Sequence, residues 1–451
     1  RRVLWASTNN VYKTAARLYK QKQKTIKDYN IDYKLADFSR EKPADYIENS
    51  TLTLADQQKL DDMVVEISRF IDEHDSIYLN AAIISDLVAR KYYHNSEGTT
   101  MITNHQVTQI GIAFNVIDEE EHINIVNVSY SGTGLNDLPT IEEIKKDLVW
   151  NMNNVKAKSS VKELEEDYNG PVLIEGRAVA LFFISKLFKT NKGIFTNRNA
   201  FSNKDEQAVK RFFEELEKDM IEDDDLKIGN DQLIVTSHPF LEEFDGQELA
   251  GSYKIDAEGV IPSEKLVLIK DGMIKQKLNG RIPAPNAESS TGSNRPLLTL
   301  NGMGKAIAPG VIKVDFKEKV AEAELMAKFK EEIVDNGEEY GIIMDIPDLK
   351  HARAPRQYHL YKVDDDSKTN IRKASFSWLG KNHLKKIIAV SDEYYVYNFQ
   401  YSGNSYGGSP SGIPATIIVP KSIVIRDMDV NKTNPKGIKP DMIVPIPGSS
   451  R

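Results

Sequence analysis

Eight histidines are the side chains of this sequence most able to bind a metal or move a proton: His74, His94, His105, His122, His238, His351, His359 and His383. A zinc peptidase helix carries two histidines about one turn apart with an adjacent glutamate, so that two imidazoles and a general base face one ion. No histidine here is followed by glutamate, and the closest pair, His351 and His359, is eight positions apart across a proline. We therefore expect surface or hydrogen-bonded histidines. A zinc site would need scattered ligands such as His238, His351 and His359 to converge to about 2.0–2.2 Å from one ion.

Glycine-rich segments carry weaker signals. Gly302-Met-Gly304-Lys305 is followed by Ala306, where a phosphate-binding loop needs Ser or Thr for magnesium, and Ser131-Gly-Thr-Gly134 lacks a third glycine. Both are predicted to be turns. The Gly/Ser-rich stretch 402–412 is predicted to be a loop that faces a substrate, because binding loops are often glycine-rich. Its candidate contact residues are Gly403, Tyr406, Gly407, Gly408 and Ser409.

Composition excludes several classes of protein. The 451 residues include 59 basic and 67 acidic side chains, a net charge of −8, which disfavours binding to nucleic acid or an anionic membrane. Cysteine is absent, which excludes disulfides, cysteine-ligated zinc, iron–sulfur clusters and thiol nucleophiles. The longest apolar run, residues 178–184, is far shorter than the roughly 18 residues of a membrane span. We expect a soluble, cytoplasmic protein, and the opening Arg-Arg-Val-Leu-Trp, without an initiator Met, leaves an upstream targeting segment open.

Hydrophobic periodicity predicts an α+β fold. Helices are expected over residues 9–28, 56–74, 140–153, 204–222 and 318–334. Thr140 and Glu143 have the spacing of a capping box at the start of the third of these helices. Residues 178–189 fit either a buried helix or a strand. Strands over 110–117 and 123–130 are expected to form a hairpin, and a turn at 168–171 is expected to lead into a strand over 172–174. Further strands are expected over 232–236, 266–269, 311–315, 340–345, 358–363, 394–399 and 415–419. We predict an α/β N-terminal domain over 1–165, which an upstream segment would complete, and a β-rich, mainly antiparallel C-terminal domain over 166–451.

Several short segments, taken in order, resemble the TldD/PmbA family, the so-called modulators of DNA gyrase. They are residues 95–99 (Asn-Ser-Glu-Gly-Thr), 168–176 (Tyr-Asn-Gly-Pro-Val-Leu-Ile-Glu-Gly), 251–260 (Gly-Ser-Tyr-Lys-Ile-Asp-Ala-Glu-Gly-Val), 268–272 with Leu278 and Arg281, 415–430 with Lys439-Pro440, and the opening residues 3–15. Each motif is weak by itself, but the shared order covers most of the chain.

The resemblance implies an α/β N-domain, a β-rich C-domain and a two-fold dimer that encloses a groove. It also implies, for active members, a metallopeptidase that cleaves unfolded peptides with a metal held by a His-Glu-x-x-x-His motif and a later Cys. Aligned by eye, Phe182 and Phe183 fall at the His-Glu pair and Leu187 falls at the second His, and the Cys cannot exist. Phe and Leu carry no lone pair for zinc, so these three degenerate motif positions are predicted to pack in a core. In this the chain is similar to the PmbA-type subunit, which lacks the metal motif.

We therefore expect a non-catalytic peptide-binding or partner subunit in proteolysis, without a cofactor. It would act as a homodimer or beside a TldD-like catalytic subunit, and an unfolded peptide would add to a free strand edge. Two alternatives stay open: a zinc metallopeptidase with ligands outside the motif, and a nucleic-acid-associated regulator, against which the net charge counts.

Overall fold

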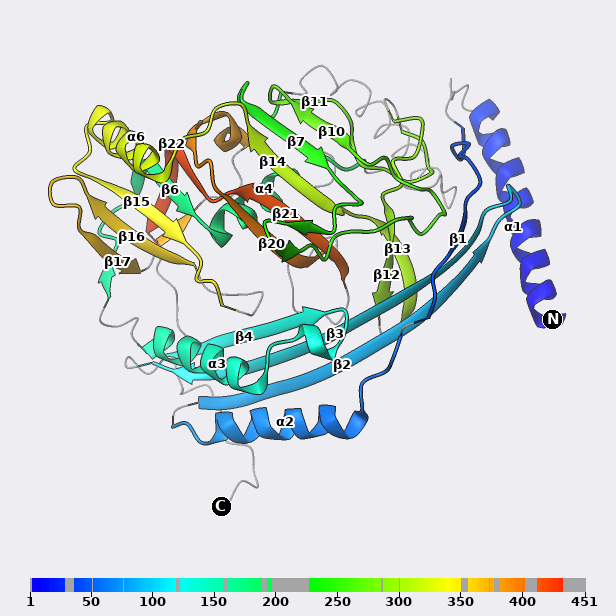
Figure 1. Ribbon diagram of the computed structural model, residues 1–451, viewed down its shortest axis with the longest axis horizontal. Helices are drawn as coiled ribbons and strands as arrows, with labels where there is room; N and C mark the ends of the chain where they lie inside the picture. Colours follow the sequence, from blue (N-terminus) through cyan, green and yellow to red (C-terminus); the bar gives the residue numbers. More distant parts are fainter. Residues whose placement is uncertain are drawn as a thin grey trace.

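The computed structural model of the chain describes residues 2–28, 36–50, 52–75, 77–118, 122–156, 161–188, 193–196, 227–284, 287–299, 301–349, 356–372, 374–376, 381–401 and 412–432. Helices and mixed, mainly antiparallel sheets make up this part of the chain, which confirms the α+β prediction (Figure 1). Its helices are α1 (Arg2–Asp28), α2 (Gln57–Asp72), α3 (Ile141–Lys156), α4 (Arg177–Leu187) and α6 (Glu322–Asp335), with 3-10 turns η1 (Leu135–Asp137) and η4 (Lys381–Lys385).

A long arched sheet forms the core of the N-terminal part of the fold. Its strands are β1 (Asp45–Ile47), β2 (Ile77–His94), β3 (Thr100–Ile117) and β4 (Ile123–Gly132). β2 and β3 pair antiparallel from the Ile77–Val116 rung to the His94–Thr100 rung, β4 pairs antiparallel with the second half of β3, and β1 joins its start in parallel. The predicted hairpin of β3 and β4 is confirmed, whereas β2 was not expected, because its sequence does not alternate cleanly between apolar and polar residues.

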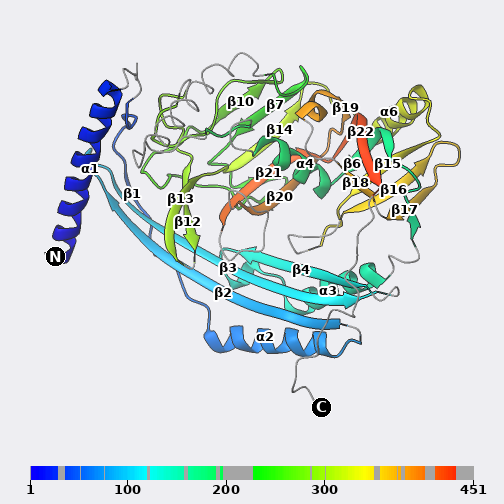
Figure 2. The same ribbon diagram turned by 180° about the vertical axis from the view of Figure 1, so that it is seen from behind.

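Two helices cover one face of this sheet. Ile67 and Ile71 of α2 and Leu148 of α3 share a core with Ile110 and Phe114 of β3. The predicted capping box is present: the backbone N–H of Thr140 donates to Glu143 (2.9 Å) and that of Glu143 donates to the Thr140 hydroxyl (3.3 Å). In both views the sheet arches beneath the C-terminal half with α2 on its outer side (Figures 1 and 2).

Two larger sheets build the C-terminal half. The six-stranded sheet has the order β11-β10-β7-β14-β21-β20, the eight-stranded sheet has the order β18-β22-β6-β15-β16-β17-β5, and β19 pairs with β22. Their strands are β5 (Lys162–Glu163), β6 (Tyr168–Glu175), β7 (Leu233–Ser237), β10 (Leu266–Lys270), β11 (Met273–Ile274), β14 (Val311–Phe316), β15 (Tyr340–Asp345), β16 (Gln357–Lys362), β17 (Lys368–Arg372), β18 (Ala374–Phe376), β19 (Ile387–Val390), β20 (Tyr394–Tyr401), β21 (Ile413–Pro420) and β22 (Ser422–Lys432). Two hairpins stand apart: β8 (Glu243–Phe244) with β9 (Gln247–Glu248), and β12 (Asn294–Thr299) with β13 (Gly302–Ile307).

Helix α4 lies between the two larger sheets. It contacts β20 and β21 on one side and β6 and β15 on the other, and its side chains join the largest hydrophobic core of the described residues. Helix α6 covers the opposite face of the eight-stranded sheet through Leu325 and Phe329. The ambiguity over 178–189 is thus resolved as a helix, because a segment buried on all sides by two sheets is apolar all round.

Two predicted turns are wrong. Residues 168–171 open strand β6, where Val430, Asp429 and Met428 of β22 pair with Tyr168, Asn169 and Gly170. Residues 302–305 lie in β13, where each pairs with a residue of β12. Gly and Pro at 168–171 and two glycines at 302–305 indicated a turn locally, and pairing with a distant or neighbouring strand overrode that preference. The helix predicted over 204–222 lies outside the described residues.

Candidate functional site

Helix α4 carries the three degenerate motif positions. Phe182, Phe183 and Leu187 have no exposed surface. The helix that carries them packs on β20 and β21, the strands that flank residues 402–411. The candidate contact residues Gly403, Tyr406, Gly407, Gly408 and Ser409 themselves lie outside the described residues.

The side chains of α4 do not fit a zinc ion. The ring of Phe182 meets that of Phe183 edge to face at 5.3 Å, and the Phe183 ring lies 6.3 Å from that of Phe316. A zinc ligand needs a nitrogen, oxygen or sulfur lone pair, which Phe and Leu lack. Lys186 of the same helix makes a polar contact, with its Nζ 3.3 Å from Nδ1 of His383. These positions therefore act as core, as the packing interpretation expected.

Two of the three scattered histidines, His238 and His359, fall in the described part of the chain. Nε2 of His238, directly after β7, lies 2.9 Å from the Thr236 hydroxyl, and His359 of β16 lies 3.4 Å from Asp345. The two belong to different sheets, and His351 lies outside the described residues. Within the described ranges, no three His, Asp or Glu side chains meet in a way that could hold a metal ion.

Strand β20 is an aromatic edge strand beside α4. Tyr397 stacks on Phe399 at 5.6 Å, and the guanidinium of Arg177, at the start of α4, lies 4.9 Å above the Tyr397 ring. The Tyr395 hydroxyl donates to Asp348 at 3.0 Å. β20 pairs with β21 on its inner side, and no strand in the part of the chain that the structure describes pairs with its outer edge. Main-chain groups on such an edge can accept an added strand.

Residues 403–407 (Gly-Asn-Ser-Tyr-Gly) match the Gly-x-Ser-x-Gly spacing of a hydrolase nucleophile. That motif works on a sharp turn from a strand into a helix. Here the flanking elements are β20 and β21, which pair antiparallel with each other. The described flanking strands are therefore not the strand and helix between which that motif works, and residues 403–407 themselves lie outside the described residues.

Segments 251–260 and 279–295 join the arched sheet to the C-terminal half. Arg281 is buried and holds Glu97, next to the tip of the β2–β3 hairpin, through two nitrogen–oxygen contacts of 2.6 and 2.8 Å. It also donates to the carbonyl of Ser39 at 2.6 Å. A bidentate guanidinium–carboxylate pair fixes both distance and orientation. This pair therefore ties three segments of the chain that are far apart in sequence.

Two buried carboxylates, Asp256 and Glu258, lie in the same contact region between the arched sheet and the C-terminal half. Asp256 accepts hydrogen bonds from the backbone N–H groups of Glu258 (2.8 Å), Val260 (3.0 Å) and Asn294 (3.2 Å). Burial raises its pKa to about 7 in spite of these bonds. Glu258 accepts from Lys305 at 2.6 Å and from the backbone of Arg281 at 2.8 Å. Although burial raises the pKa of Glu258, these bonds outweigh it and lower the pKa overall.

Lys91 and Arg295, which donate hydrogen bonds to backbone carbonyls, lie where this region contacts the arched sheet. Nζ of Lys91 on β2 donates to the carbonyl of Ala257 at 2.5 Å, and burial lowers its pKa. Arg295 on β12 donates to the Pro309 carbonyl at 2.7 Å and lies 4.3 Å from the Tyr253 ring. Burial lowers the pKa of Arg295 to about 10. The carboxylates of Asp256 and Glu258 also act on Lys91, so charges of both signs meet where β12 contacts β2 and β3.

The partly buried imidazole of His105 is expected to make the stability of the fold depend on pH. Burial, with Lys91 and Arg295 nearby, lowers its pKa to about 4 from an ordinary value of 6.5. A lowered pKa adds stability that is present above pH 6.5 and is lost as the pH falls toward 4. When the pH is lowered from 7 to 5, the free energy of unfolding of both proteins is measured in urea. The decrease for His105→Gln is expected to be about 2 kcal/mol smaller than the decrease for the unaltered chain. A curve of unfolding free energy against pH for His105→Gln that runs parallel to that of the unaltered chain would contradict the prediction.

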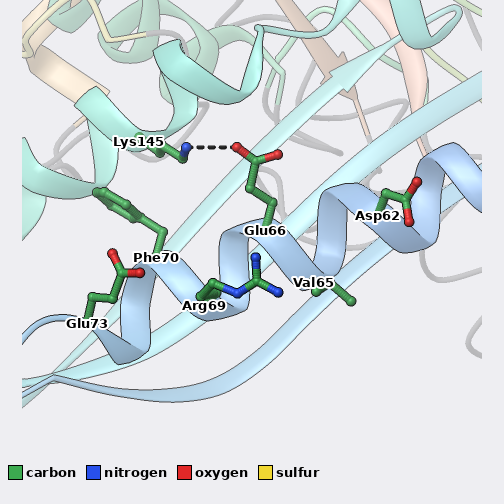
Figure 3. Close-up of a pocket in the computed structure, with 7 residues that line it drawn as sticks. All are labelled: Asp62, Val65, Glu66, Arg69, Phe70, Glu73 and Lys145. Carbon is green, nitrogen blue, oxygen red and sulfur yellow. Dashed lines mark hydrogen bonds and ion pairs between the residues drawn. The ribbon is translucent and has the colours of Figure 1, made fainter.

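The pocket in Figure 3 lies between α2 and α3 on the helix-covered side of the arched sheet, with a volume of about 430 Å³. Its lining residues are Asp62, Val65, Glu66, Arg69, Phe70, Glu73 and Lys145. Nζ of Lys145 pairs with Glu66 at 2.8 Å and with Glu142 at 3.0 Å, which links the two helices. We interpret it as a helix–helix contact surface, since its central cation is already paired.

No helix of the described residues is long and apolar enough to cross a membrane. No protein-family model and no curated protein sequence matches the chain.

Three solved structures are similar to it. A candidate modulator of a DNA gyrase from Thermotoga maritima has 14% identity and a TM-score of 0.50 over 87% of this chain and 79% of its own. TldE from Thermococcus kodakarensis has 15% identity and a TM-score of 0.48 over 88% and 79%. A candidate modulator of DNA gyrase from Bacteroides thetaiotaomicron has 11% identity and a TM-score of 0.45 over 84% and 72%. The chain therefore shares the fold of the Thermotoga maritima protein, the fold that the TldD/PmbA resemblance implied.

Proposed function

We propose that this chain is a TldD/PmbA-like, peptide-binding partner subunit in proteolysis that has no metal centre of its own. The observation that supports the proposal is the packing of α4. At the three positions where the resemblance places metal ligands, Phe182, Phe183 and Leu187 are fully buried and apolar. The helix that is catalytic in the resembled peptidases is here a scaffold for β20 and β21.

The peptide-binding element of the proposal is the outer edge of β20. An extended peptide that adds there forms main-chain hydrogen bonds, which recognise any sequence and suit an unfolded substrate. Tyr395, Tyr397 and Arg177 hold this strand against α4 and Asp348, so the edge is ordered before a peptide arrives. Ordering in advance lowers the entropic cost of binding. The chain would work as a homodimer or beside a TldD-like catalytic subunit.

The proposal predicts binding without cleavage. A fluorescein-labelled, unfolded peptide should bind the purified chain in an anisotropy titration and stay intact, and elemental analysis should find no stoichiometric zinc. N-methylation of alternate peptide amides removes the hydrogen-bond donors on one side of an added strand. Methylation in one register should therefore weaken binding by about tenfold or more, whereas methylation in the other register should leave it within about twofold. Stoichiometric zinc with chelator-sensitive cleavage would overturn the proposal and favour a zinc peptidase.

A further inference from the structure

Helix α1 carries an apolar face that no other part of the described chain covers. Seven residues make almost two full turns of an α-helix, so residues that recur every seven positions lie on one side of it. Pairs of large apolar residues recur in this way, and we call them the apolar stripe: Leu4 and Trp5, Val11 and Tyr12, Leu18 and Tyr19. Leu4, Trp5 and Tyr12 are 72%, 69% and 72% exposed. No side chain of α1 belongs to a hydrophobic core of the described residues, so the apolar stripe is open to a partner.

The opposite side of α1 is basic. This helix holds seven of the 59 basic side chains of the chain but one of its 67 acidic side chains, Asp28 at its last position. At about 100° a residue, six of the seven fall on the side away from the apolar stripe. They are Arg2, Lys13, Arg17, Lys20, Lys24 and Lys27. The net charge of −8 disfavours an anionic membrane for the chain as a whole, but the charges are segregated, and α1 is strongly cationic.

The seventh cation, Lys22, attaches the helix to the rest of the chain. It is buried and forms an ion pair with Asp37, in the segment before β1. Lys22 lies on the same side of α1 as Leu4 and Val11, so it marks the end of the apolar stripe. In both views α1 stands at the margin of the molecule, beside the far end of β2 and β3 (Figures 1 and 2). The apolar stripe can therefore meet a flat surface while the helix stays attached.

The sequence of α1 favours a lipid surface over a second helix. A two-stranded coiled coil needs a second apolar column, three or four positions after the first. Here that column is Thr8, Ala15 and Lys22. A helix at a lipid surface instead needs one broad apolar face with aromatic residues, and lysines or arginines whose long side chains reach the headgroups. Nucleic acid would pair with the basic side and leave the apolar stripe in water, whereas a bilayer takes both sides of the helix.

We propose that α1 is a membrane-surface helix, which lies in the plane of a bilayer that contains anionic phospholipids. The apolar stripe is buried at the boundary between headgroups and acyl chains, and the basic side chains contact lipid phosphates. The same surface repels the acidic remainder of the chain, which stays in water. This inference rests on α1 alone and is independent of the proposed peptide-binding function.

Co-sedimentation of the whole chain with sucrose-loaded vesicles tests the proposal. Vesicles of phosphatidylcholine with about 30% phosphatidylserine should bind the chain about tenfold more tightly than vesicles of phosphatidylcholine alone. Salt at about 0.5 M should remove most of this difference, because it screens the attraction between lysines and headgroups. Equal binding to the two kinds of vesicle, or no binding to either, would overturn the proposal.

The apolar stripe is tested by Leu4→Gln combined with Val11→Gln, which removes apolar surface without changing the charge. This variant should bind the phosphatidylserine vesicles about tenfold or more weakly. Ile125→Gln is the matched control, since Ile125 is 62% exposed on β4, and it should bind within about twofold of the unaltered chain. Thermal unfolding of each variant establishes that it is folded. Unchanged binding by the folded double variant contradicts the proposal.

The basic side is tested by Lys13→Gln combined with Lys20→Gln. Loss of the two charges should reduce the preference for phosphatidylserine vesicles by about fivefold or more. The matched control removes two exposed lysines from the C-terminal half, Lys265→Gln with Lys275→Gln, and should keep the preference within about twofold. An equal loss in both variants would mean that overall charge, and not α1, governs binding, and the proposal would be wrong.

The emission of Trp5 reports where the helix lies. Addition of phosphatidylserine vesicles should shift the tryptophan emission to shorter wavelength, because Trp5 leaves water for the interface. Trp5→Phe should lose the shift while it binds the vesicles within about threefold of the unaltered chain. A shift that persists in Trp5→Phe would contradict the insertion of α1.

Sedimentation velocity without lipid tests the remaining occupant, a second copy of the chain. If Leu4→Gln with Val11→Gln converts a dimer into monomers, the apolar stripe is an interface between two copies, and the membrane proposal is wrong. An unchanged sedimentation coefficient, together with weaker vesicle binding, supports the membrane-surface helix.

Discussion

Phe183→Ala is expected to lower the free energy of unfolding by about 4 kcal/mol, the cost of removing a fully buried aromatic side chain from a well-packed core. Phe183 has no exposed surface, and its ring contacts those of Phe182 and Phe316, so it connects α4 to the six-stranded sheet. The cavity would lie at the centre of the largest core, between two sheets that cannot both move inward to fill it. Urea titration at pH 7 measures the loss.

The control for Phe183→Ala is Val65→Ala. Val65 lies on α2 with 52% of its surface exposed, and surface substitutions usually change stability by about 0.5 kcal/mol or less. A loss below about 1 kcal/mol for Phe183→Ala would show that α4 is not a core element. It would also remove the packing argument against a metal site on this helix.

Gly251→Ala is expected to cost about 3 kcal/mol or more, because the added methyl group has no room. Its Cβ would lie 2.4 Å from the carbonyl oxygen of Gly310 and 2.6 Å from the backbone nitrogen of Thr416. Both atoms are backbone at the junction of β14 and β21, and the Gly251 N–H already donates to the Thr416 hydroxyl at 2.9 Å. Relief therefore requires strands or the 251–260 segment to shift, and the latter carries Asp256 and Glu258 into the contact region between the arched sheet and the C-terminal half.

The matched control for Gly251→Ala is Gly304→Ala. In β13 the nearest atom to a Cβ at Gly304 is 3.9 Å away, which is ordinary van der Waals contact. Thermal unfolding of the two variants should differ by several degrees or more. Equal melting temperatures would mean that the close approach at Gly251 is not a constraint on the fold.

Local signals in the sequence were enough for many elements. The capping box of Thr140 and Glu143, the hairpin of β3 and β4, and strands such as β14, β15 and β20 depend on residues within one or two turns or on strict alternation. The division into domains at residue 165 stays a prediction. Strand β2 was not predicted because its sequence does not alternate cleanly between apolar and polar residues.

For the candidate site, too, part could be predicted from the sequence and part could not. The sequence alone placed apolar residues at 182, 183 and 187, and so excluded these side chains as metal ligands, because the chemistry of a ligand is a property of the residue type. Periodicity could not decide whether that segment was a helix or a strand. The two sheets that enclose it made the decision, because a segment buried on every side carries no amphipathic pattern.

Composition determined that this chain is acidic, free of cysteine and without a strong catalytic motif, and local patterns determined most of its helices and strands. Only the tertiary structure decided which of these elements meet. It paired Arg281 with Glu97 and Lys91 with the carbonyl of Ala257, across 184 and 166 positions of sequence. Contacts between distant residues depend on strand register and packing, which a single sequence does not encode in any local pattern.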